Sequence, residues 1–345
     1  MDLARDRLRA QALVRPLASP TEVVSHLLAV QSQDLANARW AVGQRARDAT
    51  DADVERAFDA GDILRTHVMR PTWHFVAPAD IRWLLALTAP RIHALAAPYY
   101  KKAGLTAARL TACDTAIARA LKGTTLTRDE LAEQADLGVR GIWLAYAVMH
   151  AELEGVIASG PRRGKQITYA LDERAPTAPA RTRDAALAEL ARRYVTSHGP
   201  ATAKDLAWWS GLTVADARRG CELANLACTE GYFHAPLAGG AVSDPHVRLL
   251  PNYDELLVAF QDRSAALDPR VGKVDKGVIF HHAITSQGRL IGSYRRTAEK
   301  RTTVVQATLL VHPTKAERAA LVVEVERLGR FATTPIRLDL VESPR

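Results

Sequence analysis

Two stretches of the chain show the same order of a short helix, a turn and a longer helix. This repeat constrains the possible folds more strongly than any other feature of the sequence. Residues 124–145 read TTLTRDELAEQADLGVRGIWLA, and residues 199–220 read GPATAKDLAWWSGLTVADARRG. Each contains a threonine that can cap a short helix, then a turn, then a longer helix. In a helix-turn-helix unit the longer helix normally contacts DNA. The repeat therefore predicts tandem helix-turn-helix units.

Hairpin patterns beside these helices extend the plan to winged helices. The first hundred residues show helical patterns at 3–15, 20–32 and 51–60, strands at 63–68 and 73–76 joined by a turn at 70–72, and a helix at 78–96. A second hairpin, with strands at 155–160 and 166–171, follows a helix at 140–153. Helices followed by a hairpin are typical of a winged helix.

The last hundred residues are richer in strands. Strand patterns cover 247–251, 277–280, 289–294, 303–306 and 336–340, with a helix at 315–329. The segment 286–289 (SQGR) is typical of a tight hairpin, and the proline-rich and alanine-rich segment 175–180 is typical of a linker. We therefore predict an α+β, predominantly helical fold with four units: winged helices at 1–105 and 106–174, a winged-helix-like unit at 181–246, and a strand-rich module at 247–345.

Composition favours a compact protein with an anionic partner. Hydrophobic residues make up 48% of the 345 residues, and the formal net charge is +8. This charge favours nucleic acid first and a membrane surface second. No segment approaches the roughly 18 apolar residues of a membrane span, the N-terminus is unlike a signal peptide, and three cysteines suggest no disulfide framework. We expect a cytoplasmic monomer that binds DNA and no membrane.

Basic residues gather at two predicted hairpins. The segment 287–301 carries Arg289, Arg295, Arg296, Lys300 and Arg301, with Tyr294 among them. The tip of the second wing carries Arg162, Arg163 and Lys165. Such hairpins are either solvated faces or elements that contact phosphates and grooves. We predict that Arg289, Tyr294, Arg295, Arg296, Arg162, Arg163 and Lys165 contact DNA.

Standard catalytic and metal-binding patterns are missing from the sequence. There is no phosphate-binding glycine loop, no GxSxG elbow and no HExxH spacing. His281 and His282 are adjacent, so in a strand they point to opposite faces, and Cys221 and Cys228 are expected in the core. We therefore predict no metal and no cofactor.

Gln31 and Gln33 lie one residue apart at the end of an apolar helical pattern. Residues 19–22 (SPTE) form a capping box that begins this helix, and apolar residues follow at helical spacing. A glutamine on the buried side is either a structural bridge or the wall of a polar cavity, because a buried amide needs partners. Positions two apart on a helix diverge by about 200°, so both amides can face one cleft only if the helix ends near Gln31. The residues alone favour the bridge and leave the cavity open, with Asp34 as a helix-end residue.

Three segments resemble the AlkZ/YcaQ family of DNA glycosylases. They are residues 27–34, 64–75 and 249–255, and the similarity covers nearly the whole chain in the same order. Gln31-Ser32-Gln33 matches the family's catalytic glutamine-x-glutamine motif, in which the middle residue is usually hydrophobic. Ser32 departs from that pattern but leaves both amides. Gln33 indicates the AlkZ-like branch, because the other branch has aspartate at this position.

The resemblance implies tandem winged helices around a basic DNA channel, with the glutamine motif at its centre. It also implies hydrolysis of the N-glycosidic bond of alkylated purines in double-stranded DNA, including N7-guanine adducts and, in some members, interstrand crosslinks. Some relatives protect producers of DNA-alkylating natural products. We therefore predict a monofunctional glycosylase without lyase activity, for base-excision repair or self-resistance, with Gln31 and Gln33 as its catalytic residues.

Two other classes stay open. A non-catalytic winged-helix transcription factor would bind duplex DNA sequence-specifically and release no base. An interaction protein whose basic surface has no nucleic-acid role would show no salt-sensitive DNA affinity.

Overall fold

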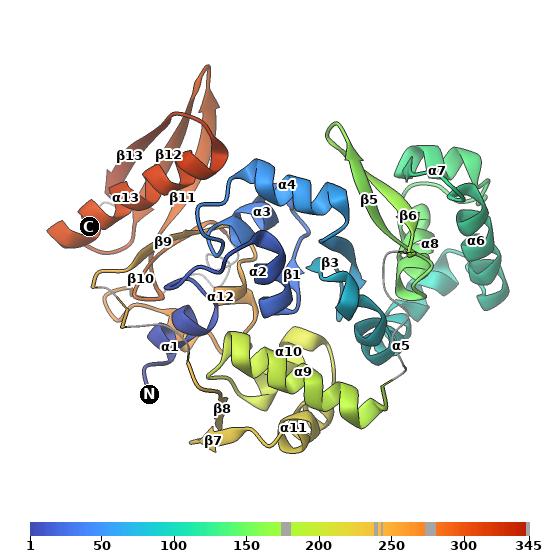
Figure 1. Cartoon of the computed structure of the whole chain (residues 1–345), viewed down its shortest axis with the longest axis horizontal. Coiled ribbons are helices and arrows are strands. Elements are labelled where there is room, and N and C mark those ends of the chain that lie inside the picture. Colours follow the sequence, from blue (N-terminus) through green and yellow to red (C-terminus); the bar gives the residue numbers. More distant parts are fainter. Residues whose placement is uncertain (174–180, 238–240, 243, 273–280, 343–345) are drawn as a thin grey trace.

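The computed structural model describes residues 1–173, 181–237, 241–242, 244–272 and 281–342. It is a mixed α+β protein with several small sheets and one five-stranded sheet near the C-terminus (Figure 1). The predicted α+β class is confirmed. Within the described residues, no helix has both the length and the apolar character needed to cross a membrane.

The N-terminal part combines five helices with a three-stranded sheet. The helices are α1 (Leu3–Ala10), α2 (Pro20–Leu27), α3 (Leu35–Gly43), α4 (Asp51–Ala60) and α5 (Pro78–Lys102). The strands are β1 (Val30–Gln31), β2 (Leu64–Val68) and β3 (Arg70–Val76), in the order β1-β3-β2. The predicted hairpin is therefore present, but its turn lies at Met69, which has a positive φ of 65°, and not at 70–72.

Helix α2 ends earlier than the sequence pattern predicts. Ser19 caps the helix, because its side chain accepts a hydrogen bond from the backbone N–H of Glu22, but the Glu22 carboxylate accepts from Ala18 N–H and not from Ser19, so only half of the predicted capping box forms. The helix ends at Leu27 and not at residue 32, and Leu28 has a positive φ of 68°. Val30 then pairs with Phe75 of β3. A short buried apolar run suits a helix or a strand equally, and here pairing with β3 decides for the strand. The predicted helix at 3–15 likewise ends at Ala10.

The two repeated segments form two further helical groups. The first contains α6 (Ala107–Ala120), β4 (Leu126–Thr127), α7 (Arg128–Gln134), α8 (Ile142–Leu153), β5 (Ile157–Arg163) and β6 (Gln166–Leu171), with sheet order β4-β6-β5. The second contains α9 (Arg183–His198), α10 (Ala203–Ser210), α11 (Val214–Leu223), β7 (Ala227–Thr229) and β8 (Tyr232–His234). Thr127 and Thr202 form capping boxes with Glu130 and Asp205. The predicted linker at 175–180 lies outside the described residues.

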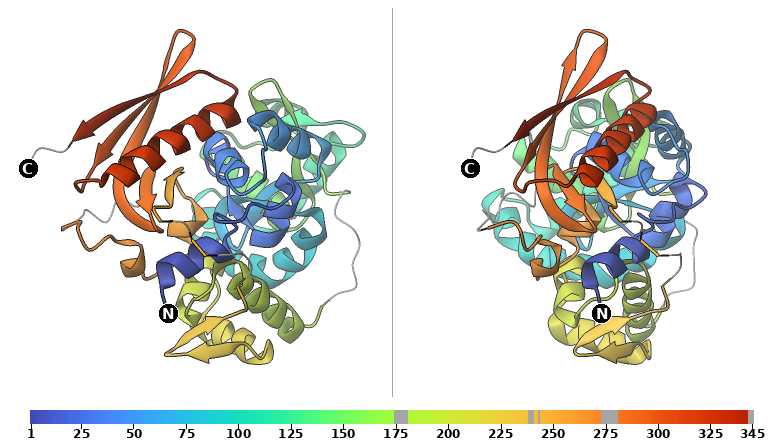
Figure 2. Two further views of the ribbon diagram at one scale, coloured as in Figure 1. Left: turned by 60° about the vertical axis from the view of Figure 1, so that its left-hand side comes forward. Right: turned by 90° about the vertical axis from the view of Figure 1, so that its left-hand side faces the viewer.

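The C-terminal part is built on the five-stranded sheet, with order β13-β12-β11-β10-β9. Its elements are β9 (Val247–Leu250), α12 (Glu255–Val258), the 3₁₀ helix η1 (Ser264–Ala266), β10 (Ala283–Ser286), β11 (Arg289–Glu299), β12 (Thr302–Leu309), α13 (Lys315–Ala332) and β13 (Ile336–Glu342). Gln287 and Gly288, both with positive φ, make the tight turn between β10 and β11. Helix α13 lies against one face of the sheet (Figure 2). The predicted strand at 277–280 lies outside the described residues.

Buried clusters cross the boundaries of the four predicted units. One cluster contains Val24 of α2 and Trp40 of α3 together with Ile284 of β10 and Phe331 of α13. The indole N–H of Trp40 donates to the backbone oxygen of Leu249 at 2.7 Å. The N-terminal helices and the C-terminal sheet therefore share a core, although they lie at opposite ends of the sequence.

A fully buried ion pair joins these same two parts. The guanidinium of Arg45 contacts both carboxylate oxygens of Asp254, at 2.8 and 2.9 Å, and both side chains have no solvent exposure. Arg45 also donates to the backbone and side-chain oxygens of Gln11. Asp254 in turn caps α12 by accepting from the N–H of Leu256. This pair fixes the start of α12 against α3.

We predict that Arg45→Met strongly destabilises the protein, because it leaves the Asp254 carboxylate buried without its cation. Removing one partner of a buried pair costs about 3–5 kcal/mol, which urea unfolding followed by circular dichroism can measure. Arg219→Ala, which breaks an exposed ion pair with Asp184, serves as the control and should leave the free energy of unfolding nearly unchanged. Equal stabilities for Arg45→Met and the wild type would contradict the role of this pair.

Candidate functional site

Gln31 is the last residue of strand β1, and Gln33 lies two residues further on, in a bend before α3. Gln31 pairs with His74 of β3, and the backbone N–H of Ser32 donates to the backbone oxygen of Trp73 at 2.8 Å, so the strand geometry continues past Gln31. Ser32 is buried, Gln31 is half-buried and Gln33 is exposed. Helix α2 ends before Gln31, which is the condition that the sequence set for both amides to face one cleft.

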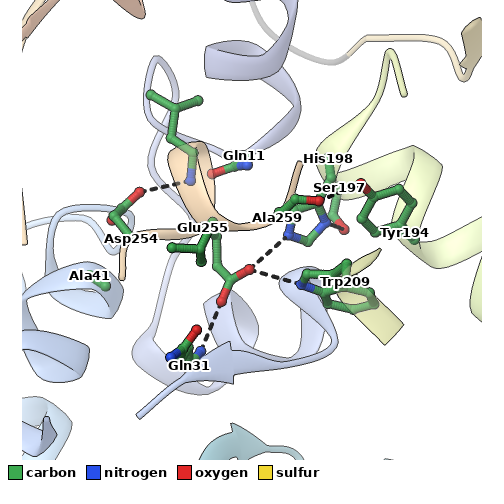
Figure 3. A network of polar contacts seen from close by, with 12 residues as sticks. Gln11, Gln31, Ala41, Tyr194, Ser197, His198, Trp209, Asp254, Glu255 and Ala259 are labelled. Atoms are coloured by element: carbon green, nitrogen blue, oxygen red, sulfur yellow. Dashed lines mark hydrogen bonds and ion pairs between the residues drawn. The ribbon is translucent and has the colours of Figure 1, made fainter. Parts of the chain in front are cut away.

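Glu255 anchors the outer edge of β1. Its Oε1 accepts the backbone N–H of Gln31 at 2.8 Å, and its Oε2 accepts the indole N–H of Trp209 at 2.9 Å. His198 Nε2 lies 3.6 Å from the same Oε2. Figure 3 shows the carboxylate between Gln31, from the N-terminal part, and His198 and Trp209, from α9 and α10. One carboxylate thus joins three parts of the chain at Gln31.

The contacts around Glu255 hold it in its ionised form. Burial alone would raise the pKa of this carboxyl, but the contact with His198, the Gln31 N–H and the charge of Arg70 outweigh burial and lower the pKa to about 2. The side chain has no solvent exposure. Glu255 is therefore a fixed negative charge that positions β1, and it does not contact a substrate itself.

Arg70 and His74 complete the surroundings of Gln31. Arg70 Nη2 donates to Oε1 of Gln31 at 3.3 Å, which fixes the direction of the amide. His74 is fully buried beside Thr72, whose backbone oxygen lies 2.9 Å from His74 Nδ1. Burial, followed by the positive charge of Arg70, lowers the pKa of His74 to about 3. His74 is therefore neutral, and it adds no charge next to the glutamines.

A second set of contacts supports the opposite side of the strand. Arg65 Nε donates to the backbone oxygen of Ser32 at 3.0 Å, and its guanidinium lies 4.3 Å from the ring centre of Trp73. The indole of Trp73 donates to Glu152 of α8 at 3.3 Å, and His67 also contacts Glu152. The hydroxyl of Ser32 is buried and has no hydrogen-bond partner among the described residues. A hydrophobic side chain at this position would avoid the cost of an unpaired hydroxyl.

The segment after the glutamines is tied to the β11–β12 hairpin. Asp34 caps α3 by accepting from the N–H of Asn37, as expected for a helix-end residue. Oδ1 of Asn37 accepts from Arg296 Nη2 at 2.9 Å and lies 3.1 Å from His282 Nε2. Burial, followed by the charge of Arg296, lowers the pKa of His282 to about 4. Arg296 thus connects strand β11 of the hairpin to the start of α3.

The other residues expected to contact DNA on this hairpin lie in different surroundings. Arg295 is exposed on β11, as are Lys300 and Arg301 at the tip. Tyr294 is 3% exposed and packs in the core against His282, so its ring does not lie on the surface as a DNA contact requires. Arg289 pairs with Asp2 at 2.8 Å. Alternation along β11 explains the difference, since neighbouring side chains point to opposite faces.

The second hairpin uses its arginines for internal contacts. Arg162 pairs with Glu55 and Asp59 of α4, at 2.6 and 3.4 Å. Arg163 contacts Glu130 and donates to the backbone oxygen of Thr125 at 2.7 Å. Lys165 is exposed at the tip. These pairs attach the hairpin to its surroundings, which charge counting in the sequence did not anticipate.

Among the cysteines and the adjacent histidines, one prediction from the sequence is wrong. Cys221 is buried as expected, but Cys228 is exposed on β7, because that strand lies at the surface. His281 is exposed, whereas His282 faces Asn37.

The residues that hold Gln31 in place were not predicted from the sequence. Glu255 lies in one of the segments with a family resemblance, but its role was not assigned, and neither were those of Arg70, His198 and Trp209. These residues come from distant parts of the chain and have no common spacing. The acidic pair Asp254-Glu255 in an otherwise apolar stretch was the available signal, since buried carboxylates need partners.

Comparisons with known proteins agree with this architecture. The family model described as "DNA glycosylase AlkZ-like" matches residues 24–331. A curated Streptomyces sahachiroi protein, described as an interstrand DNA cross-link repair glycosylase, is 26% identical over 221 residues, which are 57% of this chain and 56% of that protein. The matched region thus spans about half of that relative's length.

The solved structure of Streptomyces sahachiroi DNA glycosylase AlkZ has the same fold. It superposes with a TM-score of 0.75 over 98% of both chains, at 21% sequence identity. Because the family model covers most of the sequence, the chain belongs to the AlkZ-like family of DNA glycosylases.

Proposed function

We propose that this protein is a monofunctional DNA glycosylase that hydrolyses the N-glycosidic bond of alkylated purines, N7-alkylguanine above all. The observation that carries the proposal is the end of α2 at Leu27, after which Gln31 lies on β1 and Gln33 is exposed two residues further on. Glu255 and Arg70 then fix the backbone and the amide of Gln31. A family match over residues 24–331 supports the same activity.

The chemistry of the lesion suits neutral amides. Alkylation at N7 places a positive charge on the purine, so the base is a good leaving group and needs no strong general acid. What remains is to stabilise an oxocarbenium-like sugar and to position a water at C1′. An amide oxygen can accept from the water and present partial negative charge to the sugar. Two amides that face one cleft can hold one water between them.

Glu255 would act as a positioning residue in this mechanism. Its carboxylate is buried and holds the backbone of Gln31, so it sets the distance between β1 and α12. Arg70 occupies one acceptor direction of the Gln31 amide oxygen and leaves the second for a water. Hydrolysis by water requires no lysine nucleophile, which accords with a glycosylase without lyase activity.

We assign DNA binding to the side of the molecule from which the two hairpins extend. Figure 1 shows the β5–β6 and β11–β12 hairpins on the same side, with α4 between them. Arg295, Lys300, Arg301 and Lys165 are exposed on these hairpins. The groups α6–α8 with β4-β6-β5 and α9–α11 with β7–β8 have the composition of winged helices, which supports tandem winged helices around a DNA channel.

Interstrand crosslinks are a suitable further substrate. A crosslinked base is tethered to the opposite strand and cannot flip fully into a pocket, as many glycosylases require. Gln33 is exposed, so a base that stays near the duplex can approach it. The Streptomyces sahachiroi relative is described by its repair of such lesions, and we extend the proposal to them for this chain.

We predict that Gln31→Ala and Gln33→Ala each lower the single-turnover excision of N7-methylguanine by about 100-fold or more, the loss expected when one transition-state contact is removed. The assay counts abasic sites in duplex DNA on a gel. Gln134→Ala, at an exposed glutamine on α7, should retain full activity. Full activity in both test variants would refute the mechanism. Sequence-specific binding by the wild type without base release would instead indicate a transcription factor.

We predict that Glu255→Gln lowers the excision rate at saturating DNA by up to about 100-fold, because a shift of β1 misplaces the amides, while DNA affinity stays unchanged. Glu324→Gln, at a buried carboxylate paired with Arg248, is the matched control and should affect stability but not the rate.

Glu255→Gln also tests how the stability of the protein depends on pH. A carboxyl whose pKa falls from 4.5 to about 2 on folding stabilises the fold fully above pH 4.5 and loses this contribution as the pH falls toward 2.

Urea unfolding at pH 7, 4.5 and 3 measures this loss. The wild type should exceed Glu255→Gln in the free energy of unfolding at pH 7, and the difference should shrink below pH 4.5. If the difference in the free energy of unfolding did not depend on pH, or if Glu255→Gln left the excision rate unchanged, Glu255 would not be a positioning residue.

We predict that Arg295→Ala weakens binding to every DNA sequence and lowers the slope of log Kd against log salt by about one, as expected for a lost phosphate contact. Arg192→Ala, on α9 where Arg192 pairs with Glu189, is the control and should leave the slope unchanged. Fluorescence anisotropy at several salt concentrations gives both quantities. An unchanged slope for Arg295→Ala would exclude the hairpin from phosphate binding.

A further inference from the structure

A cluster of two histidines and one glutamate lies apart from the glutamine site. His93 belongs to α5, His150 belongs to α8, and Glu154 caps the C-terminal end of α8. One potential metal-ligand atom from each residue lies within 4.8 Å of the other two. Oε1 of Glu154 is 3.0 Å from Nε2 of His93 and 4.0 Å from Nε2 of His150. None of the three residues contributes to the contacts around Gln31.

Both histidines are oriented by a partner on their other ring nitrogen. Nδ1 of His150 lies 3.0 Å from Asp114 of α6, and Nδ1 of His93 lies 3.3 Å from the hydroxyl of Tyr100. A neutral imidazole that donates through Nδ1 keeps its Nε2 lone pair for another group. Metal-binding histidines are almost always held in this way, by a carboxylate or another acceptor. The cluster therefore has the outer contacts of a metal site as well as the candidate ligands.

The geometry of the three atoms suits a tetrahedral ion. Bonds of about 2.0–2.1 Å in tetrahedral coordination place neighbouring ligand atoms about 3.3–3.5 Å apart. The separations of 3.0 and 4.0 Å bracket this value, and the three ligand atoms all lie within 4.8 Å of one another. His93 and Glu154 also line a cavity of about 320 Å³ together with Arg82 and Pro90. This cavity gives an ion a route of entry and leaves room for a water.

We propose that His93, His150 and Glu154 bind one divalent transition-metal ion of the Zn²⁺ class, with a water from the cavity as the fourth ligand. Two imidazoles and one carboxylate are a common ligand set for such an ion. The ion would join α5 to α8, and through Asp114 also to α6, so it would fasten the helices of the second group to the N-terminal part. This proposal departs from the sequence prediction of no metal, because His93 and His150 are far apart in the sequence and match no metal motif.

Full-length protein without a histidine tag, first stripped with a chelator, provides the test. Calorimetric titration with Zn²⁺ should give one site per chain, and Co²⁺ should produce the visible absorption of tetrahedral coordination. His93→Gln and His150→Gln should each weaken Zn²⁺ binding at least about tenfold, and Asp114→Asn should weaken it by about 10–100-fold as an outer contact. His312→Gln, at an exposed histidine before α13, is the matched control and should bind normally.

Thermal unfolding distinguishes a built site from weak surface binding. Zn²⁺ should raise the Tm of the wild type and of His312→Gln, and it should not raise that of the His93→Gln/His150→Gln double variant. Circular dichroism of each variant without metal verifies that it is folded. Equal Zn²⁺ affinities for the wild type and the double variant would overturn the proposal and leave the cluster as a pair of ordinary ion pairs.

Discussion

The hydrogen bond from the backbone of Gln31 to the Glu255 carboxylate is the contact on which the candidate site depends. A fully buried carboxylate is costly unless its oxygens are satisfied, and here the partners come from β1, from Trp209 of α10 and from His198 of α9. The ion pair of Arg45 with the adjacent Asp254 fixes the start of α12 and so fixes where Glu255 lies. Gln31 therefore lies on a strand whose position is set by the N-terminal helices, the third helical group and the C-terminal part together.

Local signals in the sequence predicted much of this fold. The capping residues Thr127 and Thr202, the turn at Gln287-Gly288 and the glutamine motif are all encoded within a few neighbouring residues. Long-range contacts decided the rest. Leu28 leaves the helix because Val30 pairs with β3, and Tyr294 is buried because β11 alternates between core and surface. Glu255 could not be assigned from the sequence, since its partners lie more than 40 residues away.

The arginines of this protein fall into two groups, those in internal contacts and those exposed to solvent. A count of basic residues in the sequence does not separate the two groups. Arg45 and Arg65 are buried and hold backbone or carboxylate oxygens, and Arg162 fastens the β5–β6 hairpin to α4. Arg295, by contrast, is exposed near the tip of the other hairpin. Arg296 is part of the same hairpin but makes an internal contact, because its hydrogen bond to Asn37 links the hairpin to α3, the helix that follows the glutamines.

The central claim is that Gln31 and Gln33 together stabilise a cationic sugar. It is tested most directly by the affinity for duplex DNA that carries a cationic pyrrolidine abasic analogue, compared with a neutral tetrahydrofuran analogue, because transition-state mimics bind far more tightly than ground-state ligands. The wild type should prefer the cationic analogue by about 100-fold or more, and Gln31→Ala/Gln33→Ala should lose this preference while still binding the neutral analogue. A double variant that keeps the full preference would contradict a catalytic role for the two glutamines.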